Sequence, residues 1–163
     1  MTDADLDALL TAQSRSYRAA GEGLMRSWPE ADALDRDGLR ALLGEVVYGV
    51  LATSRPDGRA HATPVAFSLA EEAFWIGSVE GRRLANLRAL PWASLVVFDH
   101  GRGEHRALTA EGPVALHEGP AFTEARERLD AAWTARHGHP PDWAAVLLEL
   151  RPERVFSHGP RGA

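Results

Sequence analysis

The pattern of apolar and polar residues changes near residue 45, from a helical period to the short runs that are typical of strands. Between residues 3 and 20, apolar residues including Leu6 and Leu9 recur on one helical face, which predicts an amphipathic helix. A second short helix is expected over residues 37–43. Beyond it, apolar runs of strand length are separated by Gly, Pro and Asp, so most of the remaining chain is predicted to form sheet.

Six runs have the length and composition of strands. They cover residues 46–54, 59–69, 73–78, 93–99, 104–117 and 145–150, the last continued by 154–156. The Arg-Pro-Asp-Gly turn at 55–58 predicts a hairpin between the first two runs. Helical patterns cover 81–89 and 120–137, and Gly112-Pro113 is expected to bend the fifth strand. Because short connections favour antiparallel pairing, and Gly and Pro kinks allow curling, these strands are expected to close into a barrel.

We therefore expect a mainly β protein with flanking helices, built as a six-stranded antiparallel barrel in a single domain over residues 1–163. The helical N-terminal segment would cover residues 1–44, and the barrel with its two inserted helices would cover 45–158. Residues 159–163 would form a tail. A chain of 163 residues is long enough to bury roughly two thirds of its unfolded surface.

The charge balance argues against broad binding of nucleic acid. The formal net charge is −5, and all eighteen basic residues are arginine, whereas nucleic-acid binding needs an excess of positive charge on one face. The absence of cysteine excludes disulfides, thiolate nucleophiles and Cys-ligated metals. The N-terminus is acidic and has no apolar core of a signal peptide, and no apolar run approaches the roughly 20 residues of a membrane span. We therefore expect a cytoplasmic protein with neither nucleic acid nor membrane as a partner.

The strongest candidate for a binding site is the basic pair Arg82-Arg83, which follows Gly81 at the start of a predicted helix just after a strand. Free N–H groups at a helix start, the positive end of its dipole and two guanidinium forks all favour an anion such as a phosphate. The alternative is that both arginines are solvated and pair with Glu80 or Glu72.

The histidines give a weaker signal. His137 and His139 could be read as metal or haem ligands, but His-Gly-His before Pro-Pro at a helix end is more simply a helix C-terminus. No HExxH pattern is present, so we expect no metal site. His61 lies in a predicted strand, where a histidine is typically a surface or hydrogen-bonded residue, and we assign no catalytic acid or base. No Gly-x-Ser-x-Gly elbow for a nucleophilic serine is present either.

Several motifs in order resemble one known family. They are the strand at 49–53, the Pro-Asp-Gly turn at 56–58, His-Ala-Thr-Pro-Val at 61–65, Ile-Gly-Ser at 76–78, Gly-Arg-Arg at 81–83 and Glu-Gly-Pro-Val-Ala-Leu at 111–116. Together they resemble the pyridoxamine 5′-phosphate oxidase-like FMN-binding split barrels over residues 46–116. Each motif alone is degenerate, but their order and spacing are specific.

The resemblance implies a homodimer that binds FMN, or in some branches the deazaflavin F420, at the subunit interface. It implies that Arg82 and Arg83 grip the cofactor phosphate. The full set of cofactor-binding residues that it implies is His61, Ala62, Thr63, Pro64, Val65, Ile76, Gly77, Ser78, Gly81, Arg82 and Arg83. The strand residues among them would line the isoalloxazine ring and the ribityl chain.

The chain also departs from the true oxidase of that family. Ala66 stands where the oxidase has a lysine that contacts the substrate phosphate, and the oxidase's C-terminal Trp and Arg-Leu-His-Asp-Arg segment is absent. Oxidation of vitamin B6 is therefore not expected. The resemblance instead favours a flavin- or F420-dependent oxidoreductase that transfers a hydride or electrons to a small, conjugated substrate. The alternatives are a non-catalytic flavin- or haem-binding carrier or sensor, and a structural dimer without a cofactor.

Overall fold

The computed structural model describes residues 1–99 and 105–160. The N-terminal helices are α1 (Asp3–Arg18), α2 (Glu22–Ser27), the 3-10 helix η1 (Glu30–Asp32) and α3 (Arg36–Glu45). The side chain of Thr2 accepts from the Asp5 amide while the Asp5 carboxylate accepts from the Thr2 amide, so α1 begins with a capping box. Helix α2 was not predicted, because the glycines on either side of Glu22 interrupt the helical pattern.

The rest of the chain forms a curled antiparallel sheet. Its strands are β1 (Tyr48–Ser54), β2 (Ala60–Ala66), β3 (Ser68–Ala70), β4 (Ala73–Ser78), β5 (Trp92–Asp99), β6 (Arg106–His117), β7 (Val146–Leu150) and β8 (Arg154–His158). Two helices are inserted, α4 (Arg82–Ala89) and α5 (Pro120–His137). The strand order is β2-β1-β5-β6-β7-β4-β3, with β8 also on β6, and every pairing is antiparallel. The predicted fold class, a mainly β antiparallel barrel with flanking helices, is confirmed.

Eight strands replace the six that were predicted, because two predicted strands each change partner midway. The run over 59–69 divides at Phe67 into β2, which pairs with β1, and β3, which pairs with β4. The last run divides around Pro152 into β7 and β8, which pair with different halves of β6. The predicted start of the fifth strand at residue 104 lies outside the described residues, as does His100.

Strand β6 passes from one partner to the other at Gly112. The amide of Arg151 donates to the Pro113 carbonyl at 3.1 Å, and the amide of Glu153 donates to the Glu111 carbonyl at 2.8 Å. A Cβ at position 112 would lie 1.9 Å from the carbonyl oxygen of Arg151. Only glycine therefore allows the two backbones to approach closely enough for β6 to pair with both β7 and β8.

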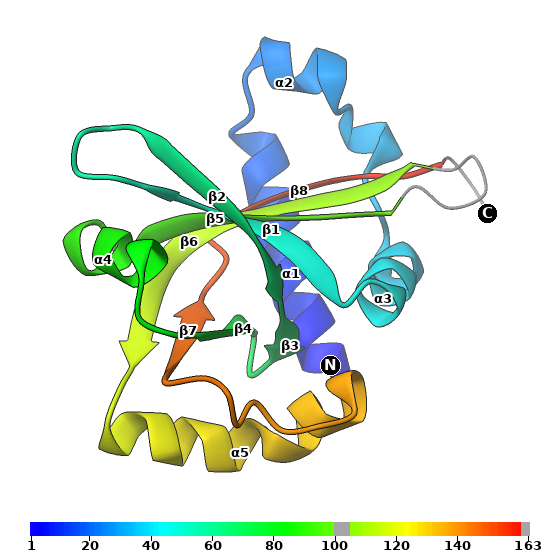
Figure 1. The fold of residues 1–163 in the computed structure, drawn as a ribbon. Coiled ribbons are helices and arrows are strands. Elements are labelled where there is room, and N and C mark those ends of the chain that lie inside the picture. Colours follow the sequence, from blue (N-terminus) through cyan, green and yellow to red (C-terminus); the bar gives the residue numbers. More distant parts are fainter. Residues whose placement is uncertain (100–104, 161–163) are drawn as a thin grey trace.

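The barrel is open along one seam. Strands β2 and β4 approach each other in space, but β2 pairs only with β1, and β4 pairs with β3 and β7. In Figure 1, α4 lies beside this opening and α5 runs along the β7 side of the sheet. Helix α1 is held on β8 by the Tyr17 hydroxyl, which donates to the Ser157 carbonyl at 2.8 Å. Among the described residues, no helix has both the length and the apolar character needed to cross a membrane.

Side chains of β1 and β5 alternate strictly between the core and the outer face of the sheet. Leu51 and Leu95 are buried in the core, whereas Tyr48 and Phe98 on the outer face are 65% and 57% exposed. Val50 and Val96 lie opposite each other on that outer face. The outer face of β1 and β5 is thus apolar and open to solvent, which is unusual for a sheet surface.

The turn between β3 and β4 is fastened to the start of α1. Both of its central residues, Glu71 and Glu72, have positive φ (53° and 61°), a conformation that side chains other than Gly and Asn rarely adopt. The carboxylate of Asp5, which is 1% exposed, accepts the Glu72 amide at 2.8 Å and the Thr2 amide at 2.6 Å. Burial alone would raise the pKa of Asp5, but these hydrogen bonds outweigh it and leave the pKa lowered.

A first prediction concerns the change of partner in β6 at Gly112. Gly112→Ala should destabilise the fold by about 3 kcal/mol or more, because its methyl group would collide with backbone that cannot move without breaking the β6–β7 or β6–β8 pairing. Gly44→Ala is the control, since a Cβ there meets nothing within 4 Å in a helix and should stabilise by up to about 1 kcal/mol. Urea denaturation measures both. Equal stability of the two variants would contradict the steric explanation.

A second prediction concerns Asp5. Asp5→Asn should lower the free energy of unfolding at pH 7 by about 1–3 kcal/mol, because an amide cannot accept all three hydrogen bonds. Since folding lowers the pKa of Asp5, its contribution is present above the unfolded value near 3.8 and is lost as the pH falls through the folded value. The difference from wild type should therefore narrow below about pH 4. Asp7→Asn, which removes only an exposed ion pair with Arg36, should change stability by less than about 1 kcal/mol at either pH.

Candidate functional site

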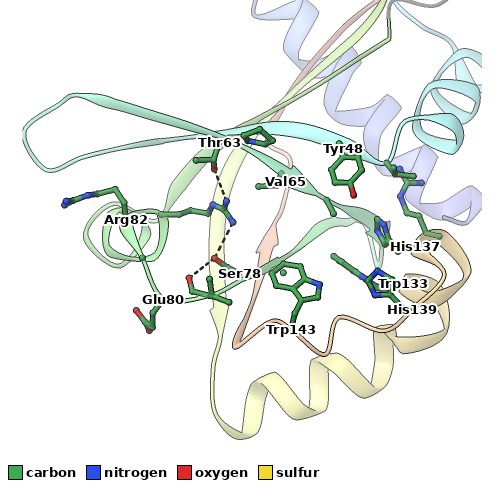
Figure 2. Close-up of a pocket in the computed structure, with 18 of the residues that line it drawn as sticks. Tyr48, Thr63, Val65, Ser78, Glu80, Arg82, Trp133, His137, His139 and Trp143 are labelled. Carbon is green, nitrogen blue, oxygen red and sulfur yellow. Dashed lines mark hydrogen bonds between the residues drawn. The ribbon is translucent and has the colours of Figure 1, made fainter.

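A cavity of about 670 Å³ lies at the open seam of the barrel. One wall is formed by β2, the end of β4 and the start of α4, and the other by the end of α5 and the loop that follows it (Figure 2). Its volume lies within the range of small-molecule sites in proteins. The residues that line it are Val47, Tyr48, His61, Thr63, Pro64, Val65, Ala66, Gly77, Ser78, Val79, Glu80, Gly81, Arg82, Arg83, Trp133, Arg136, His137, His139 and Trp143.

The guanidinium of Arg83 bridges the seam. It donates through Nη2 to Thr63 Oγ1 of β2 at 2.9 Å and through Nη1 to Ser78 Oγ of β4 at 3.4 Å (Figure 2). Its Nε is buried and has no hydrogen-bond partner among the described residues. Burial lowers the pKa of Arg83, and no carboxylate of the described chain compensates its charge. An unpaired, half-buried cation with a spare N–H is a strong attractor for an anion.

The neighbouring Arg82 behaves differently. Its side chain is exposed and extends away from the centre of the cavity (Figure 2). Successive residues of a helix point about 100° apart, so the two guanidiniums cannot both enter the seam. Of the two adjacent arginines predicted to act together, Arg83 therefore lies inside the seam and Arg82 lies at its rim.

The alternative, two solvated arginines that pair with Glu80 or Glu72, holds only in part: Arg82 is exposed, but neither arginine forms an ion pair with these carboxylates among the described residues. Glu80 instead accepts two hydrogen bonds from Arg88, at 2.6 and 3.0 Å, and Arg88 also bonds to Glu118. The pairing with Arg88 lowers the pKa of Glu80. The one carboxylate in the cavity wall is thus already committed to a cation outside it.

The first turn of α4 adds donors to the same place. Gly81, the residue that precedes the helix, has no side chain that could cap the helix N-terminus. The N–H groups of the first turn therefore have no intrahelical acceptor, and they lie next to Arg83. Together with the helix dipole they favour a negative group at this end of the cavity.

Nine of the eleven residues expected at the cofactor site line the cavity. The other two, Ala62 and Ile76, do not. Ala62 is exposed opposite Ala52 of β1, and it lies closer to the hairpin turn than Pro64 and Ala66, which share its face of β2 and do line the cavity. Ile76 is completely buried in the main core and forms no part of the cavity wall.

His61 also lines the cavity, and its Nδ1 is buried without a hydrogen-bond partner among the described residues. This nitrogen could donate to or accept from a ligand, depending on the tautomer. The described residues contain no cluster of three or more His, Cys, Asp or Glu that could hold a metal ion.

The far wall of the cavity was not predicted from the sequence. Trp133, His137 and His139 come from the end of α5, more than 50 residues away from β2 and β4, and only tertiary packing brings them together. The rings of Trp133 and His137 stack with their centroids 4.4 Å apart. The Nε1 of Trp133 is buried without a partner among the described residues, which leaves a second unused donor in the wall.

Arg136 fixes this wall in place. It donates through Nε to the Phe67 carbonyl at 2.8 Å, through Nη1 to the Leu43 carbonyl at 2.5 Å and through Nη2 to the Val46 carbonyl. Its guanidinium lies 4.7 Å from the centre of the Phe67 ring. Burial lowers the pKa of Arg136, and its bonds go to carbonyls rather than to carboxylates, so its charge adds to the positive field of the cavity.

His137 is held neutral in this field. Burial lowers its pKa, the charge of Arg136 and the neighbouring His139 lower it further, and the Phe67 carbonyl opposes them. Its Nε2 lies 3.1 Å from that carbonyl and 3.3 Å from Ser68 Oγ. The His-Gly-His sequence at 137–139 was the one signal that pointed to His137, and the sequence analysis explained it as a helix C-terminus. That explanation is correct for Gly138, which ends α5 with a positive φ of 80°.

The cavity therefore combines a cationic end, unused donors and aromatic walls, without a free carboxylate among the described residues. This donor set fits a planar ligand that carries a phosphate, since Arg83 and the α4 N-terminus can take the phosphate and the apolar walls can take a ring.

The fold is shared with several solved structures. A conserved hypothetical protein of Mycobacterium tuberculosis is 22% identical, with a TM-score of 0.67 over 79% of this chain and 88% of its own. An FAD-binding protein of Mesorhizobium loti is 23% identical, with a TM-score of 0.63 over 78% of this chain and 94% of its own. The haem storage protein HutZ of Vibrio cholerae is 19% identical, with a TM-score of 0.65 over 75% and 93%.

No curated protein matches the chain in sequence. The family model described as pyridoxamine 5′-phosphate oxidase matches residues 36–159, which include all of the strands and both walls of the cavity. The order of motifs from the β1–β2 hairpin to β6 indicated the same relationship. The chain therefore belongs to the pyridoxamine 5′-phosphate oxidase-like family of split barrels.

Proposed function

We propose that this protein binds a flavin, FMN in the first place, in the cavity at the seam. The observation that carries the proposal is Arg83, a half-buried cation with an unused N–H beside the uncapped start of α4. Each charged hydrogen bond to a phosphate contributes roughly 1.5–3 kcal/mol, so this end alone can hold a phosphate firmly. Proteins of the same fold are described as FAD-binding, which supports a flavin as the ligand class.

The rest of the cavity suits the ring of such a cofactor. Thr63 and Val65 of β2 form one wall, and Gly77 leaves β4 without a side chain opposite them. The bound cofactor would supply hydride or electron transfer to a small conjugated substrate, as in a flavin-dependent oxidoreductase. The chain would bind and orient it and exclude water, with His137 neutral at pH 7. The deazaflavin F420, which also carries a ring and an anionic tail, is the second cofactor to test.

A non-catalytic flavin or haem carrier is the alternative function. It is favoured by His61, which lines the cavity and whose Nδ1 is buried without a partner among the described residues, and by proteins of this fold described as haem-storing or haem-binding. The visible spectrum of the purified protein distinguishes flavin, deazaflavin and haem. Steady-state turnover of NAD(P)H or reduced F420 with an acceptor then separates an enzyme from a carrier.

We further propose that two copies of the chain pair through the apolar outer face of β1 and β5, closing the cavity between them. The exposed Tyr48 and Phe98 support this, because burying such side chains is a main source of dimer stability. Tyr48 belongs both to this face and to the cavity wall, so a partner seated there would lie over the mouth of the site.

A third prediction separates the two arginines. Arg83→Ala should weaken FMN binding about 100-fold or more, because two charged hydrogen bonds are lost. Arg82→Ala should weaken it by no more than about tenfold, and the effect should fall with added salt, because its charge is exposed. Flavin fluorescence titration measures both.

Arg40→Ala is the matched control, since Arg40 of α3 pairs with Asp3 of α1, neither residue lines the cavity, and the loss of this exposed pair should leave FMN affinity unchanged. Circular dichroism melting checks that each variant is folded. A folded Arg83→Ala protein that binds FMN as tightly as the wild type would contradict the proposed function.

A fourth prediction concerns assembly. The wild type should sediment at twice the 17.7 kDa chain mass, and Phe98→Asp should sediment as a monomer, because a carboxylate in the centre of the apolar face cannot be buried unpaired. Thr11→Asp, an exposed change on α1, should leave the dimer intact. Monomeric wild-type protein at micromolar concentration would contradict the proposal.

A further inference from the structure

Trp143 stands out in the cavity because it is large, apolar and 50% exposed. Its indole forms no hydrogen bond with the described residues. In Figure 2 it lies between Ser78 at the cationic end and Trp133 and His139 at the far end. A half-exposed tryptophan in the middle of a cavity has apolar surface still to bury, which distinguishes it from the core tryptophans of this chain.

The indole is held against bare backbone of β4. A Cβ at Gly77 would lie 2.9 Å from two ring atoms of Trp143, so any other residue at position 77 would displace the ring. The Cζ2 and Cη2 atoms of the indole are therefore packed on the strand.

The loop that carries Trp143 is fastened at several points. The Ala144 amide donates to the Pro141 carbonyl at 3.0 Å, which closes a turn with Asp142 and Trp143 at its centre. The Ala145 amide donates to the Ser78 carbonyl at 2.9 Å. The Asp142 carboxylate pairs with Arg126 of α5 at 3.5 Å. Because Ser78 also accepts from Arg83 through its hydroxyl, the indole and the buried cation are anchored on the same strand end.

We propose that Trp143 is the ring-stacking residue of the site: it holds the isoalloxazine ring of the bound flavin while Arg83 holds the phosphate. The inference rests on the proposed function. An electron-rich indole stacks well on the electron-poor flavin ring, and stacking would bury the apolar surface that the cavity now exposes. A side chain positioned beforehand binds more tightly than one that must be ordered on binding.

FMN and riboflavin, which lacks the phosphate, separate the two contacts. Trp143→Ala should weaken FMN and riboflavin by the same factor, about tenfold or more, because both carry the ring. Trp143→Phe should keep affinity for both within about threefold. Arg83→Ala should weaken FMN strongly and leave riboflavin unchanged, because only FMN has the phosphate.

Flavin emission gives a readout that a merely structural role would not move. A stacked indole quenches flavin fluorescence, so FMN bound to Trp143→Phe should emit more strongly than FMN bound to wild type. Trp28→Phe is the control, because Trp28 packs against His158 away from the cavity and should leave the emission unchanged.

The outcomes are distinct. If wild type binds neither FMN nor riboflavin, the proposed function fails and the stacking role fails with it. If wild type binds FMN but Trp143→Ala weakens FMN alone, or weakens neither ligand, or if emission is the same in Trp143→Phe as in wild type, only the stacking role is overturned.

Discussion

The site of this protein depends on a seam that the backbone does not close. Strands β2 and β4 come near each other but do not pair, because both edges of β4 are taken by β3 and β7, while β2 pairs with β1. The side chain of Arg83 crosses the gap, from Thr63 on one strand to Ser78 on the other. A charged group therefore stands where a fully paired barrel would have backbone hydrogen bonds, and its buried Nε has no partner among the described residues.

The seam stays open because of the route the chain takes through β6. This strand pairs with β5 from Arg106 to Pro113, and its other edge is shared between β8 and β7, with the change at Gly112. The change of partner directs β7 and β4 away from the β1–β2 hairpin, so the sheet curls without meeting itself. A glycine about 30 residues from Arg83 along the sequence thus helps to set the width of the cavity in which the arginine lies.

Charge is distributed unevenly between the surface and the cavity. Most arginines of the described chain pair with carboxylates at the surface, whereas Arg83 and Arg136 are half-buried and bond only to hydroxyls and carbonyls. Two uncompensated cations cost desolvation energy, which an anionic ligand can offset on binding. The arrangement explains how a chain with a net charge of −5 can still present a positive site.

The local pattern of the sequence determined the class of the fold, the capped start of α1 and the location of Arg83 after β4, because hydrophobic period, turn residues and helix starts act over a few neighbouring positions. It also placed most of the residues of the near wall, from His61 to Val65 and from Gly77 to Arg83. Only the tertiary structure decided which of two adjacent arginines enters the seam, since that depends on the rotation of α4 against the sheet. The same holds for Ala62, which lies exposed on β2 outside the cavity, and for Ile76, which is buried in the core. The far wall, with Trp133, Arg136 and Trp143, is formed by contacts between segments distant in the sequence, and such contacts leave no local pattern to detect.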